Sequence, residues 1–422
     1  MNIKSLPANW NLKTLGTVCK EITAGGAAPQ GENYFFGGNY PFVRVADMGK
    51  MKNSEKYLSS TKDKLNDSGI IRLRKFPAGT VLFTKSGASL LLNQRAILKI
   101  PMYVVSHIGC MIPGNDVTSD WLYYFMRQVD FAHYSHATTL PSLKLSTLKS
   151  VEIPVPPLSE QERIVARIEE LFSELDKAVE TLQTTKRQLK VYRQAVLKEA
   201  FEGKLTMNWR TQNNVPYHFE YVSVTNIVKK EKNAIKAGPF GSSLKKDCYV
   251  EYGYKIYGQE QVIAGNEHIG DYYIDKKKYD ELYSCRISPG DVLISLVGTV
   301  GKVLILSEKC EPGIINPRLI KISLDQTVML PKFFKYYFEC DYLKSLYKSK
   351  AHGETMDVLN LSIIKELPFV LCSIDEQEEI IQQIESRLSV CDSIEQTVDS
   401  ALSRADALRQ SILKEAFEGR LA

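Results

Sequence analysis

The most regular hydrophobic pattern in the chain lies in residues 158–205. Apolar side chains recur there at alternating steps of four and three residues, with a polar interruption at Thr185. This spacing places them on one narrow face of an α-helix, as in a helix that packs along a partner helix. The predicted seam comprises Ile164, Ile168, Leu171, Leu175, Ala178, Leu182, Leu189, Tyr192 and Val196.

The same pattern returns at the C-terminal end of the chain. The stretches "LKEAFEGKL" (197–205) and "LKEAFEGRL" (413–421) differ at one position, and their offset of 216 holds without a gap across 159–205 and 375–421. The second seam comprises Ile380, Ile384, Cys391, Ile394, Val398, Ala401, Ala405, Leu408 and Ile412, and is interrupted at Arg387. The chain is therefore two copies of one plan, each a variable part followed by a shared helical part.

Local signals predict where these helices begin and end. Ser159 with Glu162, and Asp375 with Glu378, have the spacing of N-terminal caps, whereas Gly203 and Gly419 are predicted stops. About 44 helical residues would make a rod of roughly 65 Å, too long for the interior of one small domain. Each rod needs a partner, and we predict that the two pair with each other as an antiparallel coiled coil. Parallel pairing, which would bring the variable parts to the same end, is the alternative.

The variable parts carry the pattern of β-strands. Short β-branched and aromatic runs are bounded by Gly, Pro or Asn. They lie at 40–48, 79–87 and 95–100 in the first copy and at 254–262, 290–298 and 301–307 in the second. The sequence therefore predicts two globular parts of mixed strands and short helices.

Composition and charge narrow the function. Hydrophobic residues make up 44% of the chain and charged residues 24%, as in ordinary soluble proteins. No apolar run approaches membrane-spanning length, no secretion signal is visible, and the eight cysteines occur without a C-x-x-C pair, so we expect a cytoplasmic protein. The variable parts hold 18 Lys+Arg against 10 Asp+Glu (1–157) and 22 against 19 (206–373), while the helical parts hold 9 against 9 and 5 against 11. A polyanion would bind the globular parts.

Catalytic motifs are missing from the sequence. It contains no G-x-G-x-x-G after a strand, no G-x-x-x-x-G-K-[ST] and no H-E-x-x-H. His133 and His136 form an H-x-x-H without a third ligand, which is more typical of surface residues than of a metal site. We therefore expect a non-catalytic protein that holds no metal.

The order of these features resembles the DNA-specificity (S) subunit of type I restriction-modification enzymes. The residues that carry the resemblance are the proline-rich approach and E-Q-E at 153–162, its counterpart D-E-Q-E at 375–378, both "LKEAFEG" stretches and "ISPGDVLISLVGTVGKV" at 287–303. The resemblance covers essentially the whole chain. One departure is "LPFVLCSIDEQ", which lacks the double proline before the second helix.

The resemblance implies an α+β protein with an internal pseudo-twofold repeat. Two target-recognition domains (1–150 and 208–366) would each read half of a bipartite double-stranded DNA site, and helices in a central repeat (151–207) and a C-terminal repeat (367–422) would set the spacing. It also implies partners: modification (M) subunits, two of them given the duplication, and restriction (R) subunits. S-adenosylmethionine would be held by the M subunit, and this chain would hold no cofactor and contact no membrane.

Candidate DNA contacts are polar side chains in turns of the variable parts. Asn and Gln suit adenine, and Arg suits guanine, so Asn93, Gln94, Arg95, Gln259, Gln261, Asn316 and Arg318 are candidates for base contacts. Candidates for phosphate contacts are Lys85, Ser86, Lys144, Ser242, Ser243, Lys245, Lys246, Thr299 and Lys302. Two other function classes stay open on the residues alone: a coiled-coil scaffold or adaptor that does not bind DNA, and an enzyme with an unrecognised site.

Overall fold

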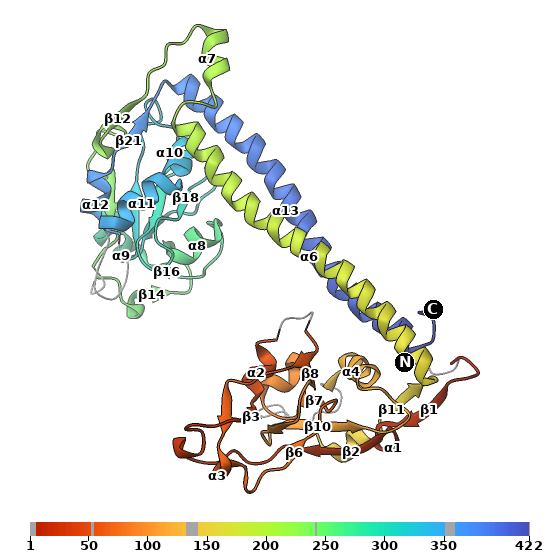
Figure 1. Ribbon diagram of the computed structural model, residues 1–422. Helices are drawn as coiled ribbons and strands as arrows, with labels where there is room; N and C mark the ends of the chain where they lie inside the picture. Colours follow the sequence, from red (N-terminus) through yellow and green to blue (C-terminus); the bar gives the residue numbers. More distant parts are fainter. Residues whose placement is uncertain (1–5, 52–54, 132–141, 241–242, 351–358, 422) are drawn as a thin grey trace. The chain divides into compact units, whose positions relative to one another are not determined.

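The computed structural model describes residues 6–51, 55–131, 142–240, 243–350 and 359–421. The chain forms two compact units. Residues 1–184 and 398–422 make the first unit, and residues 185–397 make the second. Each unit therefore combines one globular part with a portion of both long helices, which Figure 1 labels α6 and α13.

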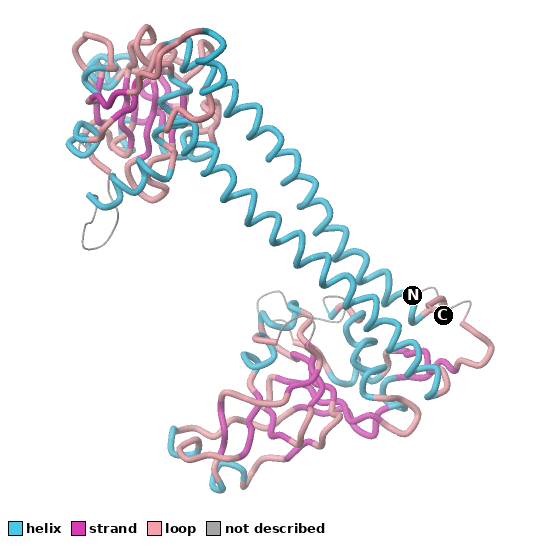
Figure 2. The backbone as a smooth tube through the Cα atoms, turned by 45° about the horizontal axis from the view of Figure 1, so that its top comes forward, coloured by secondary structure: helices cyan, strands magenta, loops and turns pink. Residues whose placement is uncertain are grey.

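The two long helices are of equal length and run antiparallel. Helix α6 spans Leu158–Phe201 and α13 spans Ile374–Phe417, 44 residues each (Figure 2). In the first unit Asp176 of α6 pairs with Arg409 of α13. In the second unit Arg193 pairs with Asp392 at 2.7 Å. As α6 advances by 17 residues its partner position falls by 17, which confirms the predicted antiparallel coiled coil.

The predicted stops are confirmed, but the predicted caps are wrong by two residues. Gly203 and Gly419 follow the helices with φ of 69° and 71°, a left-handed conformation that glycine adopts readily. The helices begin at Leu158 and Ile374, so Ser159 and Asp375 lie inside the first turn. For α13 the cap is Ser373, whose Oγ accepts a hydrogen bond from the Glu376 amide at 3.3 Å.

The seam is only partly buried. Ile164, Ile168, Ile380 and Ile384 are buried as predicted. Ala178 and Tyr192 are exposed, and so are their repeat counterparts Ile394 and Leu408. A helix that has one partner helix buries only a narrow stripe, so residues at the margin of the seam remain in contact with solvent.

The globular part of the first unit contains three sheets, with strand orders β2-β10-β7-β8-β4, β5-β3-β9-β6 and β1-β11. Helix α4 lies beside β7 and β8 (Figure 1). The strands are β1 (Asn11–Thr14), β2 (Cys19–Ala24), β3 (Tyr40–Val43), β4 (Tyr57–Leu58), β5 (Asp63–Leu65), β6 (Lys75–Phe76), β7 (Val81–Thr84), β8 (Arg95–Leu98), β9 (Met102–Val104), β10 (Ile108–Pro113) and β11 (Glu152–Val155). The short helices are α1 (Leu15–Val18), α2 (Val45–Gly49), α3 (Asp67–Ile70), α4 (Ser119–Gln128) and α5 (Leu145–Lys149).

The globular part of the second unit repeats this plan with the orders β13-β20-β17-β18, β14-β16-β15-β19 and β12-β21. Its strands are β12 (Glu220–Val222), β13 (Ile235–Ala237), β14 (Tyr249–Val250), β15 (Tyr254–Tyr257), β16 (Tyr273–Ile274), β17 (Val292–Ser295), β18 (Val303–Ile305), β19 (Gly313–Ile315), β20 (Leu319–Ile322) and β21 (Phe369–Leu371). Its helices are α7 (Met207–Asn213), α8 (Gln259–Ala264), α9 (Lys276–Glu281), α10 (Pro331–Phe338), α11 (Asp341–Lys350) and α12 (Leu361–Glu366). Each predicted strand region contains a strand, but two of the predictions extend too far, because residues 45–48 belong to α2 and residues 259–262 belong to α8.

The duplicated "LKEAFEG" stretches join each globular part to the end of a long helix. Phe417, at the end of α13, packs 4.4 Å from Trp121 of α4, between ring centroids. Phe201, at the end of α6, packs 4.9 Å from Tyr337 of α10. The exit of the first sequence copy therefore belongs to the second unit, and the exit of the second copy belongs to the first.

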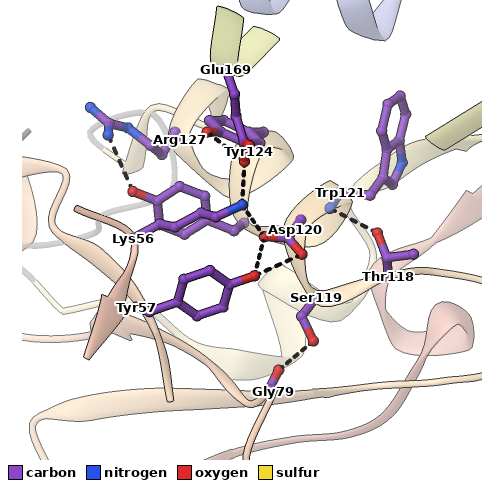
Figure 3. Close-up of polar contacts among 11 residues, drawn as sticks. Lys56, Tyr57, Gly79, Thr118, Ser119, Asp120, Trp121, Tyr124, Arg127 and Glu169 are labelled. Atoms are coloured by element: carbon purple, nitrogen blue, oxygen red, sulfur yellow. Dashed lines mark hydrogen bonds and ion pairs between the residues drawn. The ribbon is translucent and has the colours of Figure 1, made fainter. Parts of the chain in front are cut away.

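A second repeated contact ties each globular part to the start of a long helix. Figure 3 shows the contact in the first unit, where the Glu169 carboxylate of α6 pairs with the Lys56 ammonium and accepts a hydrogen bond from the Tyr124 hydroxyl. In the second unit Glu385, 216 residues further on, pairs with Lys332 at 2.7 Å. The carboxylate keeps its place in both copies. Its cation comes from the segment before β4 in the first unit and from α10 in the second.

Candidate nucleic-acid interface

Half of the candidate contacts gather at one end of a pair of central strands in each unit. In the first unit Thr84, the last residue of β7, lies opposite Ile108, the first residue of β10. In the second unit Ser295 of β17 lies opposite Leu319 of β20 in the same way. The loops that leave β7 and β17 carry the predicted polar residues, so the fold brings those loops to equivalent places.

The loop after β17 is built by hydrogen bonds to Ser295. Its Oγ accepts from the Lys302 amide at 3.1 Å and donates to the Thr299 carbonyl. Gly298 and Gly301 adopt φ of 73° and 78°, which allows the chain to turn back sharply. This arrangement leaves the side chains of Thr299 and Lys302 exposed.

Two further segments meet this loop and complete the cluster of the second unit. Arg318 is exposed, its amide is held by Asn316 Oδ1 at 2.9 Å, and its Nη1 lies 3.5 Å from Gln259 Oε1. The side-chain amide of Gln259 (Nε2) in turn donates to the Val297 carbonyl. A side chain at Gly238 would place Cβ 1.8 Å from the Asn316 carbonyl, so only glycine allows these two segments to approach. Residues far apart in sequence are thus fixed around one exposed guanidinium.

The corresponding cluster of the first unit contains Lys85, Ser86 and Lys144. The Leu143 amide donates to the Lys85 carbonyl at 3.0 Å, which places the exposed Lys144 beside the loop after β7. Ser86 Oγ lies 2.9 Å from Nδ1 of His107, an exposed residue just before β10. His107 is absent from the predicted contacts, because nothing in its local sequence distinguishes it.

Two of the predicted base contacts are buried. Arg95 is 5% exposed, and its Nε and Nη1 donate to the carbonyls of Met126 (3.2 Å) and Gln94 (2.8 Å). Its guanidinium also lies 4.0 Å from the centre of the Phe131 ring, and burial, with a smaller effect from Arg127, lowers its pKa. These contacts hold the Arg95 side chain inside the fold, so its position does not support the predicted base contact.

Gln261 is likewise committed to the fold. Its side chain is fully buried, accepts from the Gly258 amide at 2.8 Å and donates to the Ile269 carbonyl at 2.9 Å. Gln261 therefore stabilises the start of α8, and its burial does not support the predicted base contact.

The other predicted contacts are placed as follows. Asn93 and Gln94 are half-buried, and Asn93 Nδ2 donates to the Arg127 carbonyl at 2.8 Å. Lys245 and Lys246 are exposed, whereas Ser243 is half-buried. Ser242, His133 and His136 lie outside the described residues.

Within the described ranges no three His, Cys, Asp or Glu side chains gather in a group suited to a metal ion, and no helix is long and apolar enough to cross a bilayer.

Two glutamines in the repeated E-Q-E stretches were also absent from the predictions. Gln161 is fully buried, accepts from the Thr118 amide at 2.9 Å and donates to the Asp116 carbonyl at 2.7 Å. Gln377 makes the same contacts with Leu330 (2.9 Å) and Val328 (2.8 Å). These side chains hold the segments before α4 and α10 against the long helices. Their duplication in the sequence was the signal that could have identified them.

Comparison with known proteins identifies the family. The sequence model described as the type I restriction modification DNA specificity domain matches residues 7–189 and again 218–404. The chain belongs to this family. It is a specificity subunit of a type I restriction-modification system, as the resemblance predicted, and the scaffold alternative is not favoured.

Several specificity subunits are similar to this chain, some of them along its whole length. The EcoKI specificity subunit of Escherichia coli K12 is 24% identical over 443 residues, covering 100% of this chain and 91% of the relative. The EcoBI specificity subunit of Escherichia coli is 27% identical over 295 residues, 68% of this chain and 61% of the relative. All are named as specificity subunits, in agreement with the predicted non-catalytic component.

Solved structures share the fold. A chain from a study of complex assembly and conformational transition of the type I R-M system superposes with a TM-score of 0.75, at 18% identity, over 98% of this chain and 99% of that one. The HsdS subunit from Thermoanaerobacter tengcongensis gives a TM-score of 0.59, also at 18% identity, over 98% of each chain. The predicted fold class, two globular parts with paired long helices and an internal repeat, is confirmed.

Proposed function

We propose that this subunit reads a bipartite, asymmetric DNA site, and that each globular part contacts one half. The observation that carries the proposal is the duplicated cluster at the ends of β7–β10 and β17–β20, where loops with exposed basic side chains and half-buried amide side chains meet. Base edges in the major groove are distinguished by such donors and acceptors. Residues 1–150 and 208–366 would provide recognition, and 151–207 and 367–422 would provide spacing.

Within the second half-site, Arg318 is the proposed base-reading side chain. It is exposed, and among the described residues Gln259 alone hydrogen-bonds its guanidinium. The remaining donors can therefore pair with O6 and N7 of guanine. Asn316 and Gln259 support the arginine in this arrangement, and Gln259 is already engaged with the Val297 carbonyl.

The lysines predicted from the turns of the variable parts are the proposed phosphate contacts. They are exposed or half-buried and belong to the parts of the chain with excess positive charge, +8 in 1–157 and +3 in 206–373. The set comprises Lys85, Lys144, Lys245, Lys246 and Lys302, with Ser243 and Thr299 as neutral donors. Such contacts fix the protein on the duplex without distinguishing sequences.

The chain is proposed to act with partner subunits in the cytoplasm. Methylation and cleavage would come from M and R subunits, with S-adenosylmethionine on M. Because the chain carries its plan twice, two M subunits are expected. The isolated chain is then expected to transfer no methyl group, and methyl transfer by the purified chain alone would contradict this division of labour.

The experiment that tests base reading uses the subunit assembled with its M subunits and a panel of duplexes with single-base changes. We expect Arg318→Ala to lower affinity by about 1–3 kcal/mol at one base pair of one half-site. Lys302→Ala should weaken binding to all sequences and reduce the salt slope by about 1. Lys277→Ala, an exposed lysine of α9 outside the clusters, is the control. Equal, sequence-independent losses for Arg318→Ala and Lys302→Ala would contradict the proposed division.

The spacing role of the helices has its own test. Inserting four residues after Thr185, with a matching insertion in α13, lengthens the pair by roughly 6 Å. Half-site separation is set by protein geometry, so the spacer in the methylated site should change while both half-site sequences stay the same. Methylome sequencing would detect this. A changed half-site with an unchanged spacer would show that the helices do not set the spacing.

A further inference from the structure

The two units align strand by strand around the candidate interface, although their sequences differ there. Phe83 of β7 pairs with Arg95 of β8 on one side and with Gly109 of β10 on the other. Ile294 of β17 pairs with Val303 and Ile320 in the same way. This register makes β7 equivalent to β17 and β10 equivalent to β20.

The backbone that leads into β10 and β20 is held by matching hydrogen bonds. The Lys85 amide donates to the His107 carbonyl at 2.9 Å, and the Leu296 amide donates to the Arg318 carbonyl at 3.0 Å. One residue later, the Gly25 amide donates to the Ile108 carbonyl at 3.0 Å. In the same way the Gly238 amide donates to the Leu319 carbonyl at 2.9 Å. His107 therefore occupies in the first unit the position that Arg318 occupies in the second.

The side chain of His107 is also presented in a comparable way. It is exposed, as Arg318 is, and one polar neighbour holds it: Ser86 Oγ at 2.9 Å from Nδ1. Ser86 belongs to the loop after β7, and Val297, whose carbonyl anchors Gln259 beside Arg318, belongs to the equivalent loop after β17. Among the described residues, Ser86 provides the hydrogen bond to the ring, at Nδ1, and none hydrogen-bonds Nε2.

The chemistry of the site suits a purine base. When the Ser86 hydroxyl donates to Nδ1, the imidazole carries its proton on Nε2 and presents a donor. Guanine offers the acceptors N7 and O6 in the major groove. The Leu143–Lys85 hydrogen bond brings Lys144 beside Lys85 in this cluster. The two lysines supply positive charge for the adjacent phosphates.

We propose that His107 is the base-reading residue of the first globular part, that it contacts a purine of the first half-site through Nε2, and that Ser86 is its positioning residue. This inference rests on the proposed function. It replaces Arg95, the sequence-based candidate in the same unit, whose guanidinium is bound inside the fold.

The test uses the complex of this chain with its M subunits and duplexes that carry single-base changes in both half-sites. His107→Ala should reduce discrimination at one base pair of the first half-site by at least about fivefold, and leave the second half-site as in the wild type. Ser86→Ala should give a smaller loss at the same base pair, and Ser86→Thr, which keeps the hydroxyl, should restore it. His268→Ala, an exposed histidine of the second unit, is the control and should change neither half-site.

Each outcome decides between the alternatives. If the wild-type complex shows no bipartite preference, the proposed function itself fails. If the wild type is specific but His107→Ala keeps its discrimination, or weakens binding equally for every sequence, the assignment of His107 is overturned. Thermal unfolding of each variant excludes loss of folding, and His107→Gln, which retains a donor at a similar distance, serves where the alanine variant is unstable.

Discussion

Replacing Gln161 with leucine should destabilise the first unit strongly, although the side chain keeps nearly the same volume. The Gln161 amide is fully buried at the start of α6 and makes three hydrogen bonds to backbone groups. It accepts from the Thr118 amide (2.9 Å) and donates to the carbonyls of Asp116 (2.7 Å) and Pro156 (2.9 Å). It therefore ties the segment before α4 to the chain that leads into the long helix.

The magnitude follows from the groups left without partners. A buried backbone donor or acceptor that loses its hydrogen bond costs about 1–3 kcal/mol. Three backbone groups lose their partner: the Pro156 carbonyl is buried, whereas the amide of half-buried Thr118 and the carbonyl of exposed Asp116 can regain some solvation from water. We expect a loss of about 3–5 kcal/mol in the free energy of unfolding of the first unit.

The repeat provides an internal replicate. Gln377 is also fully buried, accepts from the Leu330 amide (2.9 Å) and donates to the carbonyls of Val328 (2.8 Å) and Cys372 (2.9 Å). Gln377→Leu should therefore destabilise the second unit by a similar amount, within about 1 kcal/mol.

Urea unfolding reports the two units separately. Trp10 and Trp121 lie in the core of the first unit, and Trp209 lies on α7 of the second. Fluorescence of a chain that keeps only Trp121, or only Trp209, gives the free energy of each transition. Hydrogen exchange at the Thr118 amide gives a local measurement for Gln161→Leu.

Gln183→Leu is the matched control, because Gln183 is exposed on the same helix and should change stability by less than about 0.5 kcal/mol. The reasoning would be refuted if Gln161→Leu and Gln377→Leu were no more destabilising than this control. A large loss for one glutamine and none for the other would show that the equivalent contacts differ in energy.

Three further predictions follow from the contacts of single side chains. Lys56→Met should cost about 1 kcal/mol in urea unfolding of the first unit, because Lys56 bridges Asp120 and the partly exposed Glu169; no change would show that the bridge is neutral. Arg210→Met should cost about 3–5 kcal/mol in the second unit, because it leaves the Glu376 carboxylate buried without its cation, and the double replacement with Glu376→Met should recover most of the loss. Burial raises the pKa of the Cys19 thiol to about 12, so at neutral pH it should react with a thiol reagent only after unfolding; rapid labelling of the native protein would contradict its burial.

The long helices and the duplication could be predicted from local sequence patterns. Helix periodicity, helix-ending glycines and the "LKEAFEG" stretches involve residues close together in the chain, so the pattern alone located two 44-residue helices and their stops. The constant offset of 216 then implied that each helix has a partner of the same design. The strand regions were also recognisable, since β-branched runs between turn residues are local signals.

Which polar side chains face solvent, and which lie together, depends on contacts between segments that are far apart in the chain. The surroundings of Arg95 come from α4 and Phe131, more than 30 residues away, so no local pattern could reveal its burial. The equivalence of His107 and Arg318 was hidden because their offset is 211 rather than 216, since the segment between β20 and β21 is longer than the segment between β10 and β11. Strand pairing is non-local: it brings distant segments into register through backbone hydrogen bonds that are insensitive to side-chain identity. The fold thus places two chemically different residues at one equivalent position.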